Sequence, residues 1–435
     1  MHDYFDLFYG LIPRGLPRRG SLEITTKPAL MKNTKKNRCP LKGIRVLDLS
    51  RLIPGGFCTC LLSDAGAEII KVEEPNVGDY ERQIYPFIGQ MASRFLILNR
   101  NKKSMVINLK DKRGYDIFRR MLRSADVLLE GFRPGTMEKL GLDYDSIRKE
   151  NDRLIYCSIS SFGQNGPLRD IVAHDINIMG MAGYFDMAGE REQIPEIPGI
   201  QIADSISAMY AAFAILVALI NREKTGEGQY IDISMFDGVM SWMFDAARYI
   251  FAGMSVPGNK EGRLLGGFPN YNLYQTKDGK YIAVGSLEAK FRRVLLEKLG
   301  GDKYIDEEME RTSSQFKKSD RILFEFLRNK FVTKTRDEWV KELGELNICV
   351  SPVNSVEEAL SHPQTIARKM VIEVDHPSTG RIKQIGSAIK YLNIKLDINS
   401  MPAPCFGEHT KEIMRMIGYT KDEIDDLICK GIICC

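Results

Sequence analysis

Residues 43–57 read GIRVLDLSRLIPGGF, and this stretch sets the pattern of the fold. Its first half, residues 43–50, has the apolar density of a buried strand, which Pro54-Gly55-Gly56 ends. Residues 57–64 predict a helix, and EIIKVE at 68–73 predicts a second strand. Strand, turn, helix and strand in this order predict a βαβ unit with parallel strands.

The same grammar continues along the chain. Further strands are predicted at residues 103–109, 126–130 and 154–160, and an amphipathic helix is predicted at 113–123. A long packed helix is predicted from Asp204 to residue 221, followed by a strand at 230–234 and a helix at 235–252. The fold class is therefore α/β, with a large doubly wound domain built on a parallel sheet.

The length of 435 residues favours more than one hydrophobic core. Beyond Gly253 the texture changes to loops and short strands, which predicts a smaller α+β domain. We place the large domain at residues 39–228, completed by 370–435, the small domain at 229–350, and a crossing segment at 351–369. Residues 1–38 are predicted to be an N-terminal extension.

The charge balance excludes some classes of partner. The formal net charge is +4, and residues 1–38 hold eight Lys or Arg against three Asp or Glu, so the rest of the chain is close to neutral. Such a balance does not suggest a nucleic-acid partner. The longest apolar stretch, residues 209–220, is shorter than a bilayer requires, so we expect no membrane insertion.

The nine cysteines show neither a disulfide nor a metal pattern. They stand at irregular positions, their number is odd, and no CxxC pair occurs. The first 40 residues also lack the features of a secretory signal. We therefore expect reduced thiols, no metal and a cytoplasmic location.

His174 and Asp175 are the first candidates for chemistry. They lie in AHDIN at residues 173–177, between a glycine-rich loop and a run of small residues, where a predicted helix begins. A loop-to-helix junction leaves a side chain open to substrate while a rigid element positions it. The alternative reading is a helix cap, a role that Asp175 fills well by itself.

Asp204 is the second candidate, because it heads the apolar segment IADSI at residues 202–206. Burial raises the pKa of a carboxyl group and brings it closer to the range useful for proton transfer. A helix N-cap explains the same aspartate equally simply.

Basic side chains stand near the ends of the predicted strands. They are Lys71, Arg100, Arg133 and Lys139. The carboxyl ends of parallel strands face the ligand crevice, so these groups are candidates for contacts with phosphates, although a solvated basic face explains them as well. Neither a GxGxxG motif nor a P-loop is present, which argues against dinucleotide and nucleoside triphosphate chemistry.

Several motifs together resemble the family III CoA-transferase superfamily, and within it the α-methylacyl-CoA racemases. They are LKGIRVLDL at 41–49, DAGAEIIKVE at 64–73, EGFRPG at 130–135, SFGQNGP at 161–167, GEGQ at 226–229 and GEHT at 407–410. The resemblance covers nearly everything from Pro40 to Ile417.

The resemblance implies roles for four residues. Family transferases use an aspartate at the position of Asp175 as a nucleophile, whereas racemases carry histidine immediately before it, as His174 stands here. Racemases also carry an aspartate that Asp204 matches, and a glutamate that Glu288 matches in GSLEAKF at 285–291. His174 and Asp204 are thus implied to be the two acid/base groups, with Glu288 orienting His174.

The implied reaction is racemisation of a 2-methylacyl-CoA thioester through an enolate, without a cofactor beyond the CoA of the substrate. By similarity the candidates for contacts with the phosphates and adenine of CoA are Lys71, Arg100, Arg133 and Lys139. Family members form interlocked homodimers, which implies that Glu288 serves the partner's site. The alternatives are a CoA-transferase that uses Asp175 as nucleophile, and a catalytically silent CoA-binding protein.

Overall fold

The computed structural model describes residues 39–188, 194–257, 262, 265–305, 318–392 and 401–435. The predicted extension at residues 1–38 lies outside these described residues. The described residues all belong to one compact unit.

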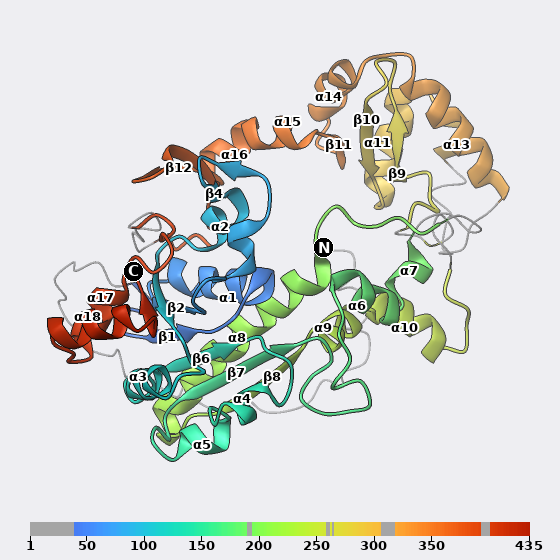
Figure 1. Cartoon of the computed structure of the whole chain (residues 1–435). Coiled ribbons are helices and arrows are strands. Elements are labelled where there is room, and N and C mark those ends of the chain that lie inside the picture. Colours follow the sequence, from blue (N-terminus) through green and yellow to red (C-terminus); the bar gives the residue numbers. More distant parts are fainter. Residues whose placement is uncertain (1–38, 189–193, 258–261, 263–264, 306–317, 393–400) are drawn as a thin grey trace, which may run out of the picture. The chain divides into compact units, whose positions relative to one another are not determined.

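A seven-stranded sheet forms the centre of the larger core (Figure 1). Its strands, in spatial order, are β14 (Ile433–Cys434), β5 (Lys102–Ile107), β2 (Glu68–Glu73), β1 (Arg45–Asp48), β6 (Val127–Glu130), β7 (Ile155–Ser160) and β8 (Tyr230–Ser234). All neighbours are parallel except β14, which pairs antiparallel with β5. The predicted parallel α/β fold is therefore confirmed.

Helices cover both faces of this sheet, as a doubly wound fold requires. One face packs against α1 (Leu52–Asp64), α6 (Asp175–Met181), α7 (Tyr184–Met187), α8 (Ile202–Thr225) and α9 (Met235–Trp242). The other face packs against α3 (Lys112–Leu122), α4 (Thr136–Lys139), α5 (Tyr144–Arg148), α17 (Thr410–Met416) and α18 (Lys421–Cys429). Successive strand residues such as Val46 and Leu47 enter opposite cores, because side chains alternate along a strand.

Helix α8 runs alongside β7 and β8 (Figure 1). By length and composition alone it is apolar enough to cross a membrane, which residues 209–220 did not suggest. Half of its most apolar window is buried inside the protein, as in the core helix of a globular domain.

The predicted domain boundary at residue 228/229 is wrong. Strand β8 begins two residues later and pairs in parallel with β7, so it belongs to the large sheet. Gly226 has a left-handed backbone with φ of +82° and ends α8, so the glycines mark a tight turn into the next strand. The helix predicted after β8 divides into α9 and α10 (Phe244–Phe251).

A separate hydrophobic core lies between residues 271 and 352. Its strands are β9 (Tyr271–Gln275), β10 (Tyr281–Gly285) and β11 (Val350–Pro352), and its helices are α11 (Ala289–Leu299), α13 (Lys318–Phe331) and α14 (Arg336–Gly344). The short helix η2 (Asp302–Tyr304) follows α11. Its sheet is antiparallel, and Trp339 and Phe331 are buried at its centre.

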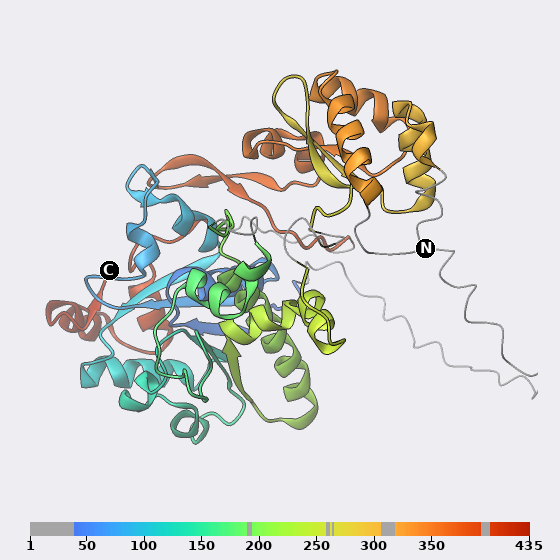
Figure 2. The same ribbon diagram turned by 90° about the vertical axis from the view of Figure 1, so that its right-hand side faces the viewer.

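A small cluster surrounds α2 (Ser93–Leu98). It contains η1 (Tyr80–Gln83), β3 (Phe87–Ile88), β4 (Met91–Ala92), β12 (Val371–His376) and β13 (Gly380–Ile385). Helices α15 (Val356–Ser361) and α16 (Pro363–Ala367) precede β12 and contact each other. The hairpin of β12 and β13 packs its apolar face on α2 (Figure 2). Gln384 fixes this contact by donating to the Leu96 carbonyl at 3.1 Å.

Candidate active site

Two neighbouring cavities open at the carboxyl edge of the large sheet. The larger has a volume of about 560 Å³ and is lined by residues that follow β1, β6, β7 and β8. The smaller, about 330 Å³, is lined mainly by residues in or after β1, β2, β5 and β6. Ser50, Arg51 and Phe132 contribute to both. In doubly wound sheets, ligands bind outside the carboxyl ends of the strands where the strand order reverses, here beside β1.

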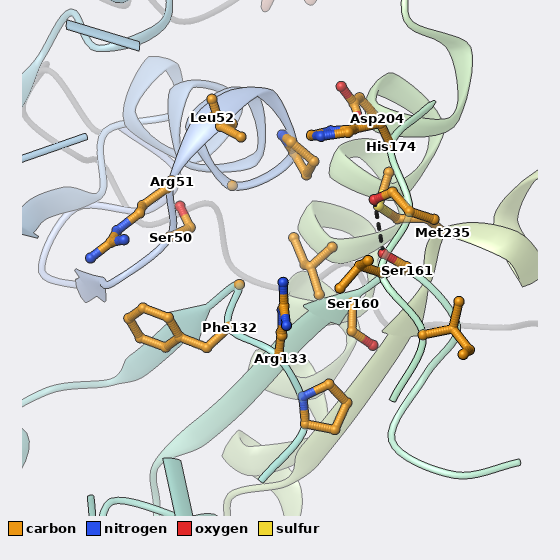
Figure 3. A pocket seen from close by; sticks show the side chains of 18 of the residues that line it. Ser50, Arg51, Leu52, Phe132, Arg133, Ser160, Ser161, His174, Asp204 and Met235 are labelled. Atoms are coloured by element: carbon orange, nitrogen blue, oxygen red, sulfur yellow. Dashed lines mark hydrogen bonds between the residues drawn. The ribbon is translucent and has the colours of Figure 1, made fainter. Parts of the chain in front are cut away.

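His174 lines the larger cavity from the N-terminus of α6 (Figure 3). Its backbone N–H donates to the Asn177 side-chain oxygen at 3.0 Å, which fixes the start of the helix. The preceding loop is held by Ser161, whose hydroxyl donates to the Ala173 carbonyl at 3.3 Å. The imidazole itself is exposed, so it is available to a molecule in the cavity.

Asp204 lines the same cavity from the first turn of α8. Burial raises the pKa of this carboxyl group, and the neighbouring Asp175 raises it further. His174 acts in the opposite direction, and the resulting pKa is about 6. This value brings both protonation states of Asp204 within reach near neutral pH.

Asp175 lies between these two residues but has a different task. Its carboxylate accepts a hydrogen bond from the Asp204 backbone N–H at 3.2 Å, so it caps the first turn of α8 and ties α6 to it. Asp175 is half-buried and does not line either cavity. The capping role foreseen for this aspartate is thus present, but at a helix other than its own.

Glu288 occupies the N-cap position of α11. Its carbonyl accepts from the backbone N–H groups of Phe291 and Arg292, both at 3.0 Å. It does not line either cavity, so the structure does not bring it together with His174 and Asp204 in one chain. Its role in a partner's site stays a prediction.

The four predicted CoA contacts divide into two pairs. Arg133 lines the larger cavity and Lys139 the smaller. Lys71 and Arg100 line neither, because both are buried in ion pairs, with Asp79 at 2.7 Å and with Asp64 at 2.6 Å. The structure gives no support to CoA contacts by Lys71 and Arg100, since their charges are already matched inside the protein.

Two cations that follow strand ends at the cavities were missed from the sequence, as was Arg169, which lines the larger cavity from the loop after β7. Arg51 stacks over the Tyr80 ring at 4.9 Å and pairs with Glu74 at 2.7 Å, and Lys110 pairs with the same Glu74 at 3.0 Å. Arg51 lines both cavities and Lys110 the smaller one. The signal was available, because each lies within three residues of the carboxyl end of a parallel strand.

Glu130 fixes the loop that carries Phe132 and Arg133 into the cavities. Its carboxylate accepts from the Phe132 backbone N–H at 2.7 Å. Burial at the end of β6 raises the pKa of Glu130 to about 7, although hydrogen bonds from Ser158 and Phe132 oppose this effect.

Within the part of the chain that the structure describes, no group of three His, Cys, Asp or Glu could hold a metal ion.

Comparison with known proteins fits this geometry. Residues 41–410 match the sequence model of the protein family described as CoA-transferase family III. The chain is 32% identical to the succinyl-CoA:glutarate CoA-transferase of Mus musculus, covering 91% of this chain and 90% of that protein. It is also 32% identical to the α-methylacyl-CoA racemase of Homo sapiens, covering 90% and 97%.

A solved structure shows the same fold. A CAIB/BAIF family protein from Brucella suis is 30% identical, with a TM-score of 0.76 that covers 87% of this chain and 99% of that one. The matched region includes both cavities and all the candidate residues discussed above. The chain is therefore an enzyme of CoA-transferase family III, the superfamily that unites CoA-transferases with acyl-CoA racemases.

Proposed function

We propose that this enzyme racemises 2-methylacyl-CoA thioesters by removing and returning the proton on the carbon beside the thioester carbonyl. One observation carries the proposal: His174 and Asp204 line the same cavity, whereas Asp175, the carboxylate that a transferase needs, does not. Two acid/base groups at one cavity suit a reaction that must deprotonate one face of a carbon and reprotonate the other.

The pair works with one proton shared between its members. In one direction neutral His174 takes the α-proton while protonated Asp204 delivers its own to the opposite face of the enolate. The products are imidazolium and carboxylate, which is the starting state for the reverse direction. A pKa of about 6 for Asp204 lets its carboxyl group both hold and release the proton near neutral pH.

The CoA moiety is the part of the substrate that the smaller cavity is suited to hold. Lys110 and Lys139 lie there, Arg133 lines the larger cavity, and Arg51 lines both. Guanidinium and ammonium groups bind phosphates through charge-assisted hydrogen bonds. In this arrangement the nucleotide end occupies the smaller cavity and the acyl end reaches His174. No cofactor beyond this CoA is needed.

The test is isotope exchange. The purified protein is incubated with single enantiomers of 2-methylacyl-CoA esters in D₂O, without any free carboxylic acid. We expect deuterium at the α-carbon together with loss of optical activity. Absence of exchange for every acyl chain in the panel would refute the racemase proposal.

A CoA-transferase is the second candidate, favoured by the likeness to the succinyl-CoA:glutarate enzyme and by the partly exposed Asp175. In that reaction the Asp175 carboxylate attacks the thioester carbonyl, CoA leaves as thiolate, and an acyl anhydride remains on the enzyme. Hydroxylamine traps such an anhydride as a hydroxamate at Asp175. Trapping, together with CoA transfer to an added acid, would select this candidate over the first.

We also propose that the protein is a cytoplasmic homodimer. The apolar side chains of Met209, Phe213 and Ile220 lie at helical spacing on one face of α8, with exposed fractions of 52, 65 and 61%. An apolar stripe of this kind favours a protein partner, here a second copy of the chain. Phe213→Asp is expected to convert a dimer into a monomer in size-exclusion chromatography, and a wild-type monomer would refute the proposal.

A further inference from the structure

The turn that joins β1 to α1 forms part of both cavities, and its backbone is strained. Ser50 and Arg51 line both cavities, and Leu52 lines the larger one. Leu52 has φ of +64°, in the left-handed region that a residue with a branched side chain rarely adopts. Such a conformation persists only where the surroundings hold it.

Buried charged side chains stabilise this turn through hydrogen bonds to its backbone. The Asp79 carboxylate accepts from the backbone N–H of Leu52 and of Glu81, both at 3.0 Å. Lys71 forms an ion pair with Asp79 at 2.7 Å and donates to the Ser50 carbonyl at 3.0 Å. On the other side of the turn, Asp48 accepts from the Ser50 backbone N–H at 2.9 Å.

These charges are inaccessible to a ligand. Lys71 and Asp48 are fully buried, and Asp79, although part of the smaller cavity's wall, is 1% exposed. Burial alone would lower the pKa of Lys71, but the carboxylates of Asp48 and Asp79 raise it above its ordinary value, so the ammonium stays charged. The same ammonium neutralises Asp79, which would otherwise repel the phosphates of CoA.

We propose that Lys71 and Asp79 are positioning residues that hold the Ser50 to Leu52 turn in its left-handed conformation and thereby present Arg51 to both cavities. The inference rests on the proposed binding of CoA at these cavities. The position of Arg51 depends directly on the turn, because Arg51 lies between Ser50 and Leu52, whose backbone groups bond to Lys71 and Asp79. Loss of the network therefore lets the turn relax and moves Arg51 away from its place over Tyr80.

The decisive experiment is a rescue. Lys71→Met removes the ammonium and keeps a long apolar side chain, and we expect the dissociation constant for CoA, measured by calorimetry, to rise roughly tenfold. Leu52→Gly removes the need for support, since glycine adopts positive φ without strain. The double variant is expected to bind CoA within about threefold of wild type.

Asn76→Gly is the matched control, because Asn76 also has positive φ, of +72°, but lines neither cavity. Added to Lys71→Met it is expected to give no recovery. If Lys71→Met does not fold, the same comparison is made with Asp79→Asn, measured alone and in combination with Leu52→Gly. In turnover, Lys71→Met should raise KM and leave kcat within about twofold, as expected for lost ground-state binding.

Three results would overturn the inference: unchanged CoA affinity in Lys71→Met, no recovery with Leu52→Gly, or equal recovery with Asn76→Gly. The readout separates this idea from the proposed reaction, because CoA binding does not depend on which chemistry follows. If isotope exchange fails but Leu52→Gly still restores CoA binding, only the racemase proposal is refuted. If the wild-type protein binds no CoA, both the racemase proposal and the positioning role of Lys71 and Asp79 are refuted.

Discussion

Asp204→Asn is expected to abolish turnover while making the folded protein more stable at neutral pH. Burial, and after it the Asp175 carboxylate, raises the pKa of Asp204 from 3.8 to about 6 in the folded protein. A carboxyl group with a raised pKa binds its proton more tightly in the folded state. The free energy of unfolding therefore falls as the pH rises from about 4 to about 6, and it stays at the lower value above that range. Asparagine has nearly the same shape and carries no charge at any pH.

The size of the effect follows from the pKa. A rise from 3.8 to about 6 corresponds to about 3 kcal/mol, at about 1.36 kcal/mol for each pKa unit. Asp204 keeps some contact with water, so we expect a gain of about 2 to 3 kcal/mol in the free energy of unfolding at pH 8. At pH 4 the wild-type carboxyl is protonated in the folded state and about half protonated in the unfolded chain, and the gain shrinks to roughly 0.5 kcal/mol.

Urea unfolding of both proteins at pH 4, 6 and 8 measures this difference. Asp245→Asn is the control, because Asp245 is 57% exposed and forms a surface ion pair with Arg248, and its loss should change stability by about 0.5 kcal/mol or less. A destabilised Asp204→Asn protein at pH 8, or a gain that does not depend on pH, would refute the idea that the site stores an unfavourable charge.

Three further outcomes are expected. His174→Gln should lower the rate of α-proton exchange at least about 100-fold and leave the CoA dissociation constant within about twofold, as calorimetry can check. The pH profile of kcat/KM, for the direction in which the Asp204 carboxylate is the base, should fall on the acid side of about pH 6, because protonation of Asp204 removes that base; a profile flat down to pH 5 would contradict this assignment. Lys110→Ala should weaken CoA binding about tenfold at low salt and less at high salt, whereas Lys112→Ala, on an exposed cation nearby that lines neither cavity, should not.

Six of the seven strands of the large sheet could be predicted from the sequence, because their signals are local, whereas β14 and the strand order could not. Apolar runs such as residues 68–73 and glycine breaks mark each strand and turn, and alternation along a buried strand assigns residues to the two cores. The boundary at residue 228/229 failed for the same reason. A glycine turn has one local appearance whether the next strand continues the sheet, as β8 does, or begins another domain.

The candidate acid/base pair, His174 and Asp204, could be identified from sequence motifs, but the roles of Lys71 and Arg100 could not. Lys71 was placed at a strand end, yet it lies in a central strand beneath α1, where Asp48 and Asp79 meet it from other elements. Arg100 meets Asp64 across 36 positions of the chain. Whether a cation faces a ligand or a buried carboxylate depends on such long-range contacts, which no periodicity encodes.

Strand β14 has a consequence for how the molecule assembles. Ile433 pairs with Ile107, so the backbone hydrogen-bonding groups on the outer edge of β5 have their partner strand only after more than 300 further residues have been synthesised. During synthesis that edge is open, and its row of free amides and carbonyls is the surface on which nascent chains adhere to one another. We therefore expect fragments that end before residue 430 to depend on chaperones and to aggregate in their absence, even though they contain every side chain of the two cavities.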